Sequence, residues 1–167
     1  YIEVFKGPAG SLYGAGTGGL ILIHNLDRWQ PGATAEYITG SYNLQHLFAS
    51  ARFGQKENKN QFTYAHNQSD GYRVQSKMRR DNFSWISQLK ITARQQLTAS
   101  VLFTDMYYQT PGALTLAEYT TDPETARPAA GGFPSAVNAK AAIWQKNILA
   151  GFTHYYQFNP AFTNTTT

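Results

Sequence analysis

Polar and apolar residues alternate with a period of two in several separate stretches of this chain. Successive side chains of a β-strand point to opposite faces, so this alternation is typical of strands that have one apolar and one polar face. Each stretch is roughly long enough to cross a bilayer as a tilted strand, which takes about 9–11 residues. The stretches are 47–54, 61–67, 83–92, 97–107 and 148–157.

The composition excludes several other classes of protein. The longest strongly apolar run, 20–23, is far shorter than the ~18 residues of a membrane-spanning helix, and the mean hydropathy is −0.42. Aromatic residues make up 14% of the chain, too many for a disordered one, and there is no cysteine for a disulfide or a thiolate metal site. The net charge of +4 is too small to indicate nucleic-acid binding by itself.

The predicted connections differ greatly in length. We expect short turns at 40–43, 55–60, 93–96 and about 158–161, and longer loops at 70–81 and 108–146. Four prolines fall in the last loop (Pro111, Pro123, Pro128 and Pro134), where they interrupt no strand ladder. Thr115 and Glu118 have the spacing of a capping box, which predicts a short helix there.

Aromatic residues cluster near the predicted strand ends, as in the two girdles of a transmembrane barrel. A soluble β-sandwich also alternates and also buries aromatic rings, so it remains an alternative. Arg52 and Lys90 lie in mid-strand, where a sandwich seldom places a charge on its packed side. This favours the barrel.

The opening segment is rich in glycine, and Gly14-Ala15-Gly16-Thr17-Gly18-Gly19 contains a match to the dinucleotide-binding pattern. That chemistry needs a helix directly after the glycines. Residues 20–23 instead read as a strand, so a nucleotide site is rejected. No serine has the context of a hydrolase nucleophile, and no catalytic residue is predicted.

The same segment resembles the end of the plug domain of TonB-dependent outer-membrane receptors. The motif residues are Glu3, Lys6, Gly7, Pro8, Leu12, Tyr13, Gly14, Gly16, Gly18 and Gly19. Two further motifs resemble outer loops of this family: Ser69-Asp70-Gly71-Tyr72-Arg73, and Pro111-Gly112-Ala113-Leu114-Thr115. The second is similar to the ferric citrate type of siderophore receptor, where a glycine usually stands in place of Ala113.

The resemblance implies an all-β fold, in which 1–29 is the C-terminal end of a plug and 30–167 the N-terminal part of a transmembrane β-barrel. About seven antiparallel strands would form an open, curved and tilted sheet. Because the sequence begins and stops within predicted strands, we expect a piece of a longer chain.

The resemblance also implies a function: a receptor in the bacterial outer membrane that binds a ferric siderophore or a ferric citrate-like chelate and imports it with energy transmitted by TonB. TonB would engage a segment absent here. The expected protein is monomeric, contacts outer-membrane lipid and lipopolysaccharide, and has no enzymatic activity, cofactor, resident metal or nucleic-acid partner. Cobalamin or a glycan as cargo remains open, as does a soluble all-β binding module.

Basic residues in the predicted outer loops are the candidate ligand contacts. Loop 70–81 would carry Arg73, Lys77, Arg79 and Arg80, and the long loop would carry Gln109 and Arg127. Arginine suits the carboxylates of a chelate. The competing interpretation is that the cations of loop 70–81 contact lipopolysaccharide phosphates or are simply solvated. The four histidines show no spacing typical of metal ligands.

Overall fold

The computed structural model describes residues 2–8, 18–23 and 29–167. Its contacts divide the chain into two units, Tyr1–Pro31 and Gly32–Thr167. The predicted motif residues Leu12, Tyr13, Gly14 and Gly16 lie outside the described residues.

The first unit contains two antiparallel strands, β1 (Ile2–Lys6) and β2 (Gly19–Ile23). The glycine at the start of β2 is required by the pairing. Gly19 has φ +144°, and a Cβ atom there would lie 2.6 Å from the carbonyl oxygen of Phe5. A glycine therefore allows the two backbones to approach each other, as expected for a structural glycine.

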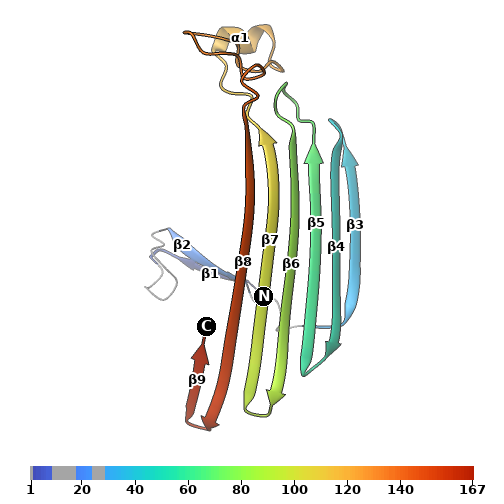
Figure 1. The fold of residues 1–167 in the computed structure, drawn as a ribbon, viewed down its shortest axis with the longest axis vertical. Coiled ribbons are helices and arrows are strands. Elements are labelled where there is room, and N and C mark those ends of the chain that lie inside the picture. Colours follow the sequence, from blue (N-terminus) through green and yellow to red (C-terminus); the bar gives the residue numbers. More distant parts are fainter. Residues whose placement is uncertain (1, 9–17, 24–28) are drawn as a thin grey trace. The chain divides into compact units, whose positions relative to one another are not determined.

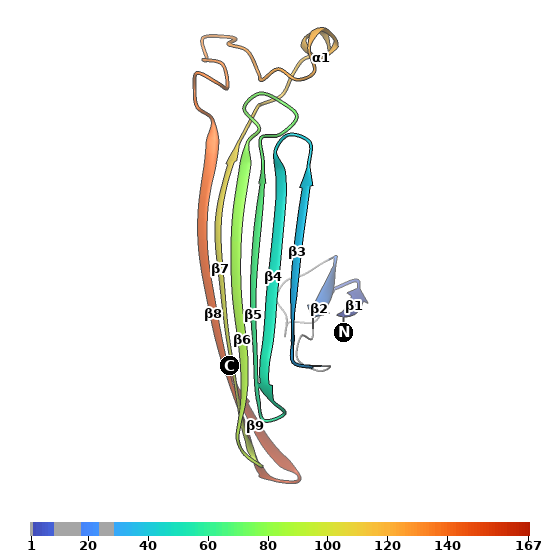
Figure 2. The same cartoon turned by 90° about the vertical axis from the view of Figure 1, so that its right-hand side faces the viewer.

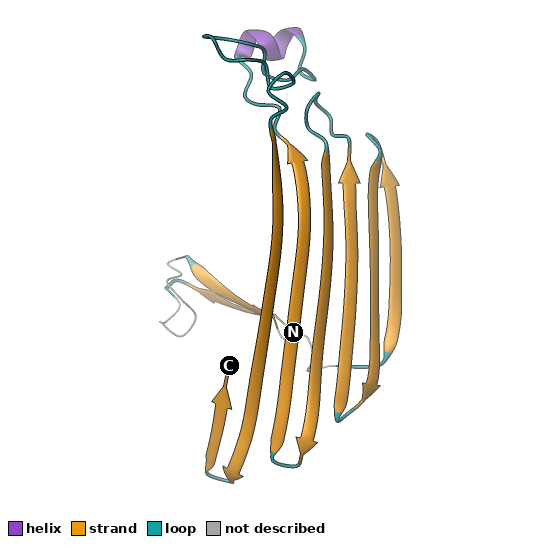
Figure 3. Ribbon diagram, viewed as in Figure 1, coloured by secondary structure: helices purple, strands orange, loops and turns teal. Residues whose placement is uncertain are grey.

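The second unit is an antiparallel sheet of seven strands in sequence order (Figures 1 and 3). The described part of the chain thus has an all-β fold with one short helix. The strands are β3 (Gly32–Gly40), β4 (Leu44–Gln55), β5 (Asn58–Ser69), β6 (Met78–Thr92), β7 (Gln95–Gln109), β8 (Ala142–Asn159) and β9 (Phe162–Thr166).

The connections at the two ends of the sheet are unequal. At one end β4–β5, β6–β7 and β8–β9 are joined by two residues each, 56–57, 93–94 and 160–161. At the other end the connections are 41–43, 70–77 and 110–141, and the last contains helix α1 (Leu116–Thr121). Figure 2 shows the strands bowing along their length between these two ends. None of the helical segments in the described residues has the length and apolar content to span a membrane.

The strands at the long-loop end are longer than the sequence predicted. The loop expected at 70–81 ends at residue 77, and the loop expected at 108–146 covers only 110–141. The reason is that the alternation is lost near this end although the ladder continues. Residues 79–82 of β6 are polar on both faces, and in β8 residues 142–144 are apolar and 145–147 polar on both faces. Arg79 and Arg80 consequently lie in β6, and Gln109 is the last residue of β7.

The strand register brings the apolar sides of all five alternating stretches onto one face. One row across this face, Ala35, Ala49, Tyr64, Phe83, Phe103 and Ile148, follows directly from the paired residues. The neighbouring row is Ala33, Ala51, Phe62, Trp85, Val101 and Ala150. We call this side the apolar face and the other the polar face; Arg52 and Lys90 lie on the polar face.

The sheet is a single layer. Among the described residues the only buried apolar residues are Ala126 and Ala136, both in the long loop. Large side chains of the apolar face are exposed instead: Ile148 is 75% and Phe152 56% exposed. Within the second unit, residues 32–167, no other layer packs on either face, in contrast to the packing expected of a soluble sandwich.

Candidate functional site

The 70–77 loop and the long loop are joined at the end of the sheet by hydrogen bonds. The amide of Val74 donates to the carbonyl oxygen of Glu124 at 2.7 Å, and Arg73 Nε donates to that of Thr125 at 3.0 Å. The Gln75 amide Nε2 donates to the carbonyl of Ala141 at 3.1 Å. The two loops therefore form one surface despite their separation in sequence.

Helix α1 begins as its sequence predicts. The Thr115 side chain accepts a hydrogen bond from the Glu118 amide at 3.3 Å, and the Thr115 amide donates to Glu118 Oε2 at 2.7 Å. This is a complete capping box. The hydrogen bond from the Thr115 backbone lowers the pKa of Glu118, because it stabilises the ionised carboxylate.

A hollow of about 620 Å³ lies where the two loops meet. Two tyrosines line it, Tyr72 from one loop and Tyr119 from α1, and they are 50% and 59% exposed. Arg73 also lines it, and its Nη2 atom is enclosed without a hydrogen-bond partner. We call this the loop hollow; its other lining residues are Leu114, Thr115, Leu116 and Pro123.

The structure separates the predicted ligand residues into different roles. Of the ligand residues we predicted, Arg73 alone lines the loop hollow. Arg127 instead holds the long loop together, since its guanidinium donates to the carbonyl oxygens of Pro128 at 3.1 Å and Pro134 at 2.7 Å. Lys77 pairs with Asp70 at 3.0 Å, and this interaction lowers the pKa of Asp70.

Placing Arg79, Arg80 and Gln109 in loops was wrong. Arg79 and Arg80 are adjacent residues of a strand, so they point to opposite faces of the sheet. The Gln109 side chain accepts a hydrogen bond from the Lys77 amide at 3.2 Å and thereby links the ends of β6 and β7. No local pattern signals this directly, because polar residues on both sides of a strand look like a loop.

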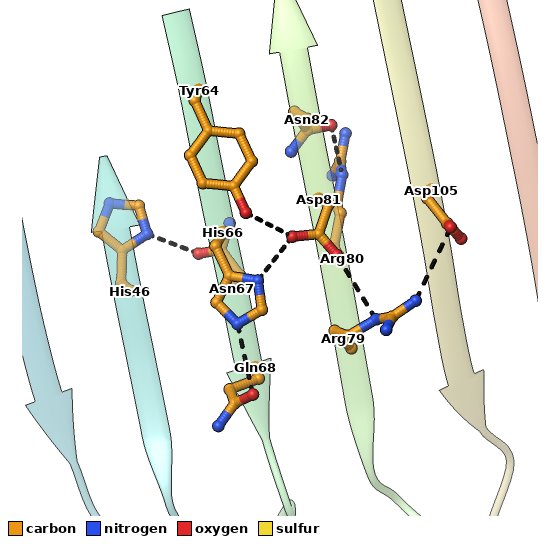
Figure 4. Close-up of polar contacts among 10 residues, drawn as sticks. All are labelled: His46, Tyr64, His66, Asn67, Gln68, Arg79, Arg80, Asp81, Asn82 and Asp105. Atoms are coloured by element: carbon orange, nitrogen blue, oxygen red, sulfur yellow. Dashed lines mark hydrogen bonds and ion pairs between the residues drawn. The ribbon is translucent and has the colours of Figure 1, made fainter. Parts of the chain in front are cut away.

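A row of charged side chains continues the apolar face toward the long loops (Figure 4). Asp81 accepts hydrogen bonds from Tyr64 at 2.8 Å and lies 2.7 Å from His66 Nδ1. Arg79 lies 3.5 Å from Asp81 and 3.7 Å from Asp105, and Lys146 lies 3.4 Å from Asp105. This cluster was not predicted; its only signal in the sequence was the i, i+2 spacing of Arg79 and Asp81 in β6.

The polar face carries its own network beside this row. His46 Nδ1 lies 2.6 Å from Asn67 Oδ1, as Figure 4 also shows. Asn82 Oδ1 accepts from Arg80 Nε at 3.1 Å and from Thr104 Oγ1 at 3.0 Å. Arg80 is therefore oriented along the sheet by a neighbour on its own strand.

Over residues 2–8, 18–23 and 29–167, no three histidine, aspartate or glutamate side chains gather in a way that could hold a metal ion. The loop hollow itself is lined by one arginine and two phenol rings, groups that can form hydrogen bonds, stack on a ring and carry charge.

Neither the known protein-family models nor the curated proteins include a match to this chain.

Proposed function

We propose that the seven-stranded sheet is part of the wall of a barrel in a bacterial outer membrane, and that the protein is a TonB-dependent receptor for a ferric chelate. The observation that carries this proposal is the exposed apolar face, combined with a polar face on the same strands. No catalytic residue or cofactor takes part in this function.

Lipid is the solvent that suits such a face. Monomeric soluble proteins rarely expose a contiguous apolar patch larger than a few hundred Å². Here two complete rows of apolar residues cross six strands of the sheet, and three of their large members, Tyr64, Phe83 and Ile148, are exposed. In the interior of the sheet the strand ladder satisfies the backbone N–H and C=O groups, which a lipid environment requires.

The unequal ends of the sheet support an orientation in the membrane. Outer-membrane barrels have short periplasmic turns and longer loops outside the cell. The two-residue turns 56–57, 93–94 and 160–161 would then be periplasmic, and 41–43, 70–77 and 110–141 would be outside. The loop hollow would accordingly meet ligands from the medium.

The residues that line the loop hollow favour a ligand of one kind, a chelate with carboxylate or phenolate groups. The Arg73 guanidinium can donate charge-assisted hydrogen bonds to such groups, and Tyr72 and Tyr119 can stack on a ring. Iron enters this proposal as cargo within its chelate. TonB as the energy source, and the outer-membrane lipid and lipopolysaccharide as surroundings of a monomer, follow from the resemblance of the opening segment to a plug.

The position of the wall can be tested with single cysteines, because the chain has none of its own. The full protein that contains this chain would be labelled with a fluorophore and placed in bilayers of brominated lipid, which quenches by contact. Labels at Val101 and Ile148 should be quenched strongly. Labels at the adjacent Ser100 and Asn147, on the polar face, should be quenched little. Equal quenching at adjacent positions would contradict the proposal that the sheet is part of a barrel wall with one face in lipid.

The cargo can be tested by uptake of radioactive iron, supplied as ferric citrate or as a ferric catecholate. Deleting the gene, or inactivating TonB, should abolish uptake of one of them. Arg73→Gln should weaken its binding about tenfold, the scale of one charge-assisted hydrogen bond. Arg94→Gln, in a turn at the other end, is the matched control. Iron uptake that survives deletion of the gene would contradict the ferric assignment. So would import of cobalamin or a glycan by a protein that imports neither iron chelate.

A further inference from the structure

One cationic side chain lines the loop hollow, and it is held in place. The Arg73 Nε atom donates to the Thr125 carbonyl at 3.0 Å. The Arg73 backbone is fixed as well, because its amide donates to Ser76 Oγ at 3.1 Å and its carbonyl accepts from the same hydroxyl. An anion in the hollow would therefore meet a guanidinium that is already oriented, so little conformational entropy is lost on binding.

The two aromatic rings of the loop hollow are also fixed by their neighbours. The Tyr72 ring packs edge-on against Tyr42 of the 41–43 turn, with centroids 5.8 Å apart and planes at 83°. Tyr119 is carried by α1, whose first turn is closed by the capping box. Both rings remain half exposed or more, and Leu116, which lines the same hollow, is 81% exposed. An aromatic ligand that covers these side chains removes their apolar area from water.

The threonine of the loop hollow has no donor left for a ligand. The Thr115 hydroxyl donates to Glu118 Oε2 at 2.9 Å, and the Thr115 amide donates to the same oxygen at 2.7 Å. The groups that can donate to an anion are therefore the Arg73 guanidinium and the two phenols. The capping box also brings a carboxylate to the edge of the hollow.

Two further carboxylates make the loop hollow unfavourable for a polyanion. Asp122 and Glu124 flank Pro123, which lines the hollow. Desolvation raises the pKa of the Tyr72 phenol, and the charges of Glu124 and Asp122 raise it further because they lie near that ring. A ligand with one acidic group can be neutralised by Arg73. Any additional carboxylate would face these two carboxylates and that of the capping box, and like charges placed side by side repel.

We propose that the loop hollow binds an aromatic ring that bears one acidic group, with the ring against Tyr72 and Tyr119 and the acidic group at Arg73, and that it rejects polycarboxylates such as ferric citrate. The inference rests on the proposed function and narrows it, since the cargo would be a chelate whose aryl group enters the hollow. It departs from the ferric citrate type of receptor, to which the 111–115 motif is similar. One guanidinium cannot balance several ligand carboxylates where three protein carboxylates are close by.

The test uses the full protein in an uncharged detergent, with small probes that separate the ring from the charge. Benzoate has an aromatic ring and one carboxylate, cyclohexanecarboxylate has the same charge without the aromatic ring, and citrate has three carboxylates and no ring. Ligand-observed NMR titrations give the dissociation constants. We expect benzoate to bind about tenfold more tightly than citrate, the scale of one charged contact, and several-fold more tightly than cyclohexanecarboxylate.

Variants show whether the probes bind in the loop hollow. Arg73→Gln should weaken benzoate binding about tenfold, and Tyr119→Ala should reduce the preference for benzoate over cyclohexanecarboxylate. Phe133→Ala is the matched control, because Phe133 is a 72% exposed ring of the same loop that does not line the hollow. Asp122→Asn combined with Glu124→Gln should strengthen citrate binding more than benzoate binding. Retained β-sheet circular dichroism shows that a variant has folded.

Three results would overturn the inference: citrate binding as tight as benzoate binding, equal binding of cyclohexanecarboxylate and benzoate, or equal losses in Phe133→Ala and Tyr119→Ala. A preference for citrate together with TonB-dependent uptake of ferric citrate would refute the inference and leave the proposed function intact. Benzoate binding in the hollow, in a protein whose deletion spares iron uptake, would refute the proposed function and support the ligand class. The hollow would then take an aryl acid that is not an iron chelate.

Discussion

Arg73 and Arg127 lie in the two long loops at one end of the sheet, 70–77 and 110–141, yet their guanidinium groups serve different purposes. Both Nη atoms of Arg127 donate hydrogen bonds to carbonyl oxygens of its own loop, so Arg127 stabilises that loop. Arg73 uses Nε to join two loops and leaves Nη2 without a partner beside the loop hollow. Residue type alone therefore could not separate an arginine that lines the hollow from one that holds a loop together; the partners of each nitrogen do.

Gly54 gives a prediction at the level of a single backbone position. Its φ is +114°, and a Cβ atom would lie 1.8 Å from the carbonyl oxygen of Asn58, across the turn to β5. Gly54→Ala should therefore lower the free energy of unfolding by about 2 kcal/mol or more, the scale of backbone strain plus a clash. Urea unfolding of the full protein in detergent would measure this.

Gly32→Ala is the matched control for that change, because a Cβ atom at Gly32 meets nothing within 4 Å. It should leave stability within about 0.5 kcal/mol of the parent. Equal effects of the two substitutions would show that the Gly54 turn is not built as described.

At the scale of elements, the sequence predicted the strands in the middle of the sheet but not their full length. Residues 97–107 alternate because one side is apolar and the other polar, and this difference is what the pattern detects. Arg79 and Arg80 face opposite sides of the sheet and are both charged, so no alternation marks the start of β6 and it could not be predicted. Helix α1 was predictable because Thr115 and Glu118 form a local motif.

The loop hollow could be predicted only in part, for a related reason. Arg73 was identified from its basic character, whereas Tyr119 was not identified. These two residues line one hollow only because the Val74 amide donates to the Glu124 carbonyl and so joins the two loops. Such a contact depends on the fold of both loops. No local pattern in the sequence encodes it.

The capping box of α1 predicts a pH dependence. The pKa of Glu118 is lowered from the ordinary 4.5, so the ionised carboxylate stabilises the helix fully above that value. This contribution is lost as the pH falls through the lowered pKa. Hydrogen exchange of the α1 amides, corrected for intrinsic rates, should therefore increase in this acidic range.

Glu118→Gln removes the titrating group and keeps an oxygen that can accept from Thr115. In this variant the corrected exchange should no longer change across the same pH range. A pH response that persists would contradict the assignment of the effect to Glu118.

At the scale of the whole sheet, the two outer strands bear on the proposed barrel. Among the described strands, β3 pairs only with β4, and β9 only with β8, so each has an unpaired edge. An open edge in lipid would leave backbone N–H and C=O groups unsatisfied. The proposed wall therefore requires further strands beside β3 and β9, which close the barrel as neighbours of this sheet.

The unequal ends of the sheet predict which residues can be reached from outside the cell. Phe133 lies in the long loop and is 72% exposed, whereas Arg94 lies in a two-residue turn at the opposite end. These 167 residues contain no cysteine, so once any cysteine elsewhere in the full protein is replaced, single cysteines report these positions cleanly. A membrane-impermeant maleimide should label Phe133→Cys in intact cells, and Arg94→Cys only after the outer membrane is permeabilised. Labelling of Arg94→Cys in intact cells, or protection of Phe133→Cys there, would contradict the proposed orientation, because the two residues lie at opposite ends of one continuous sheet.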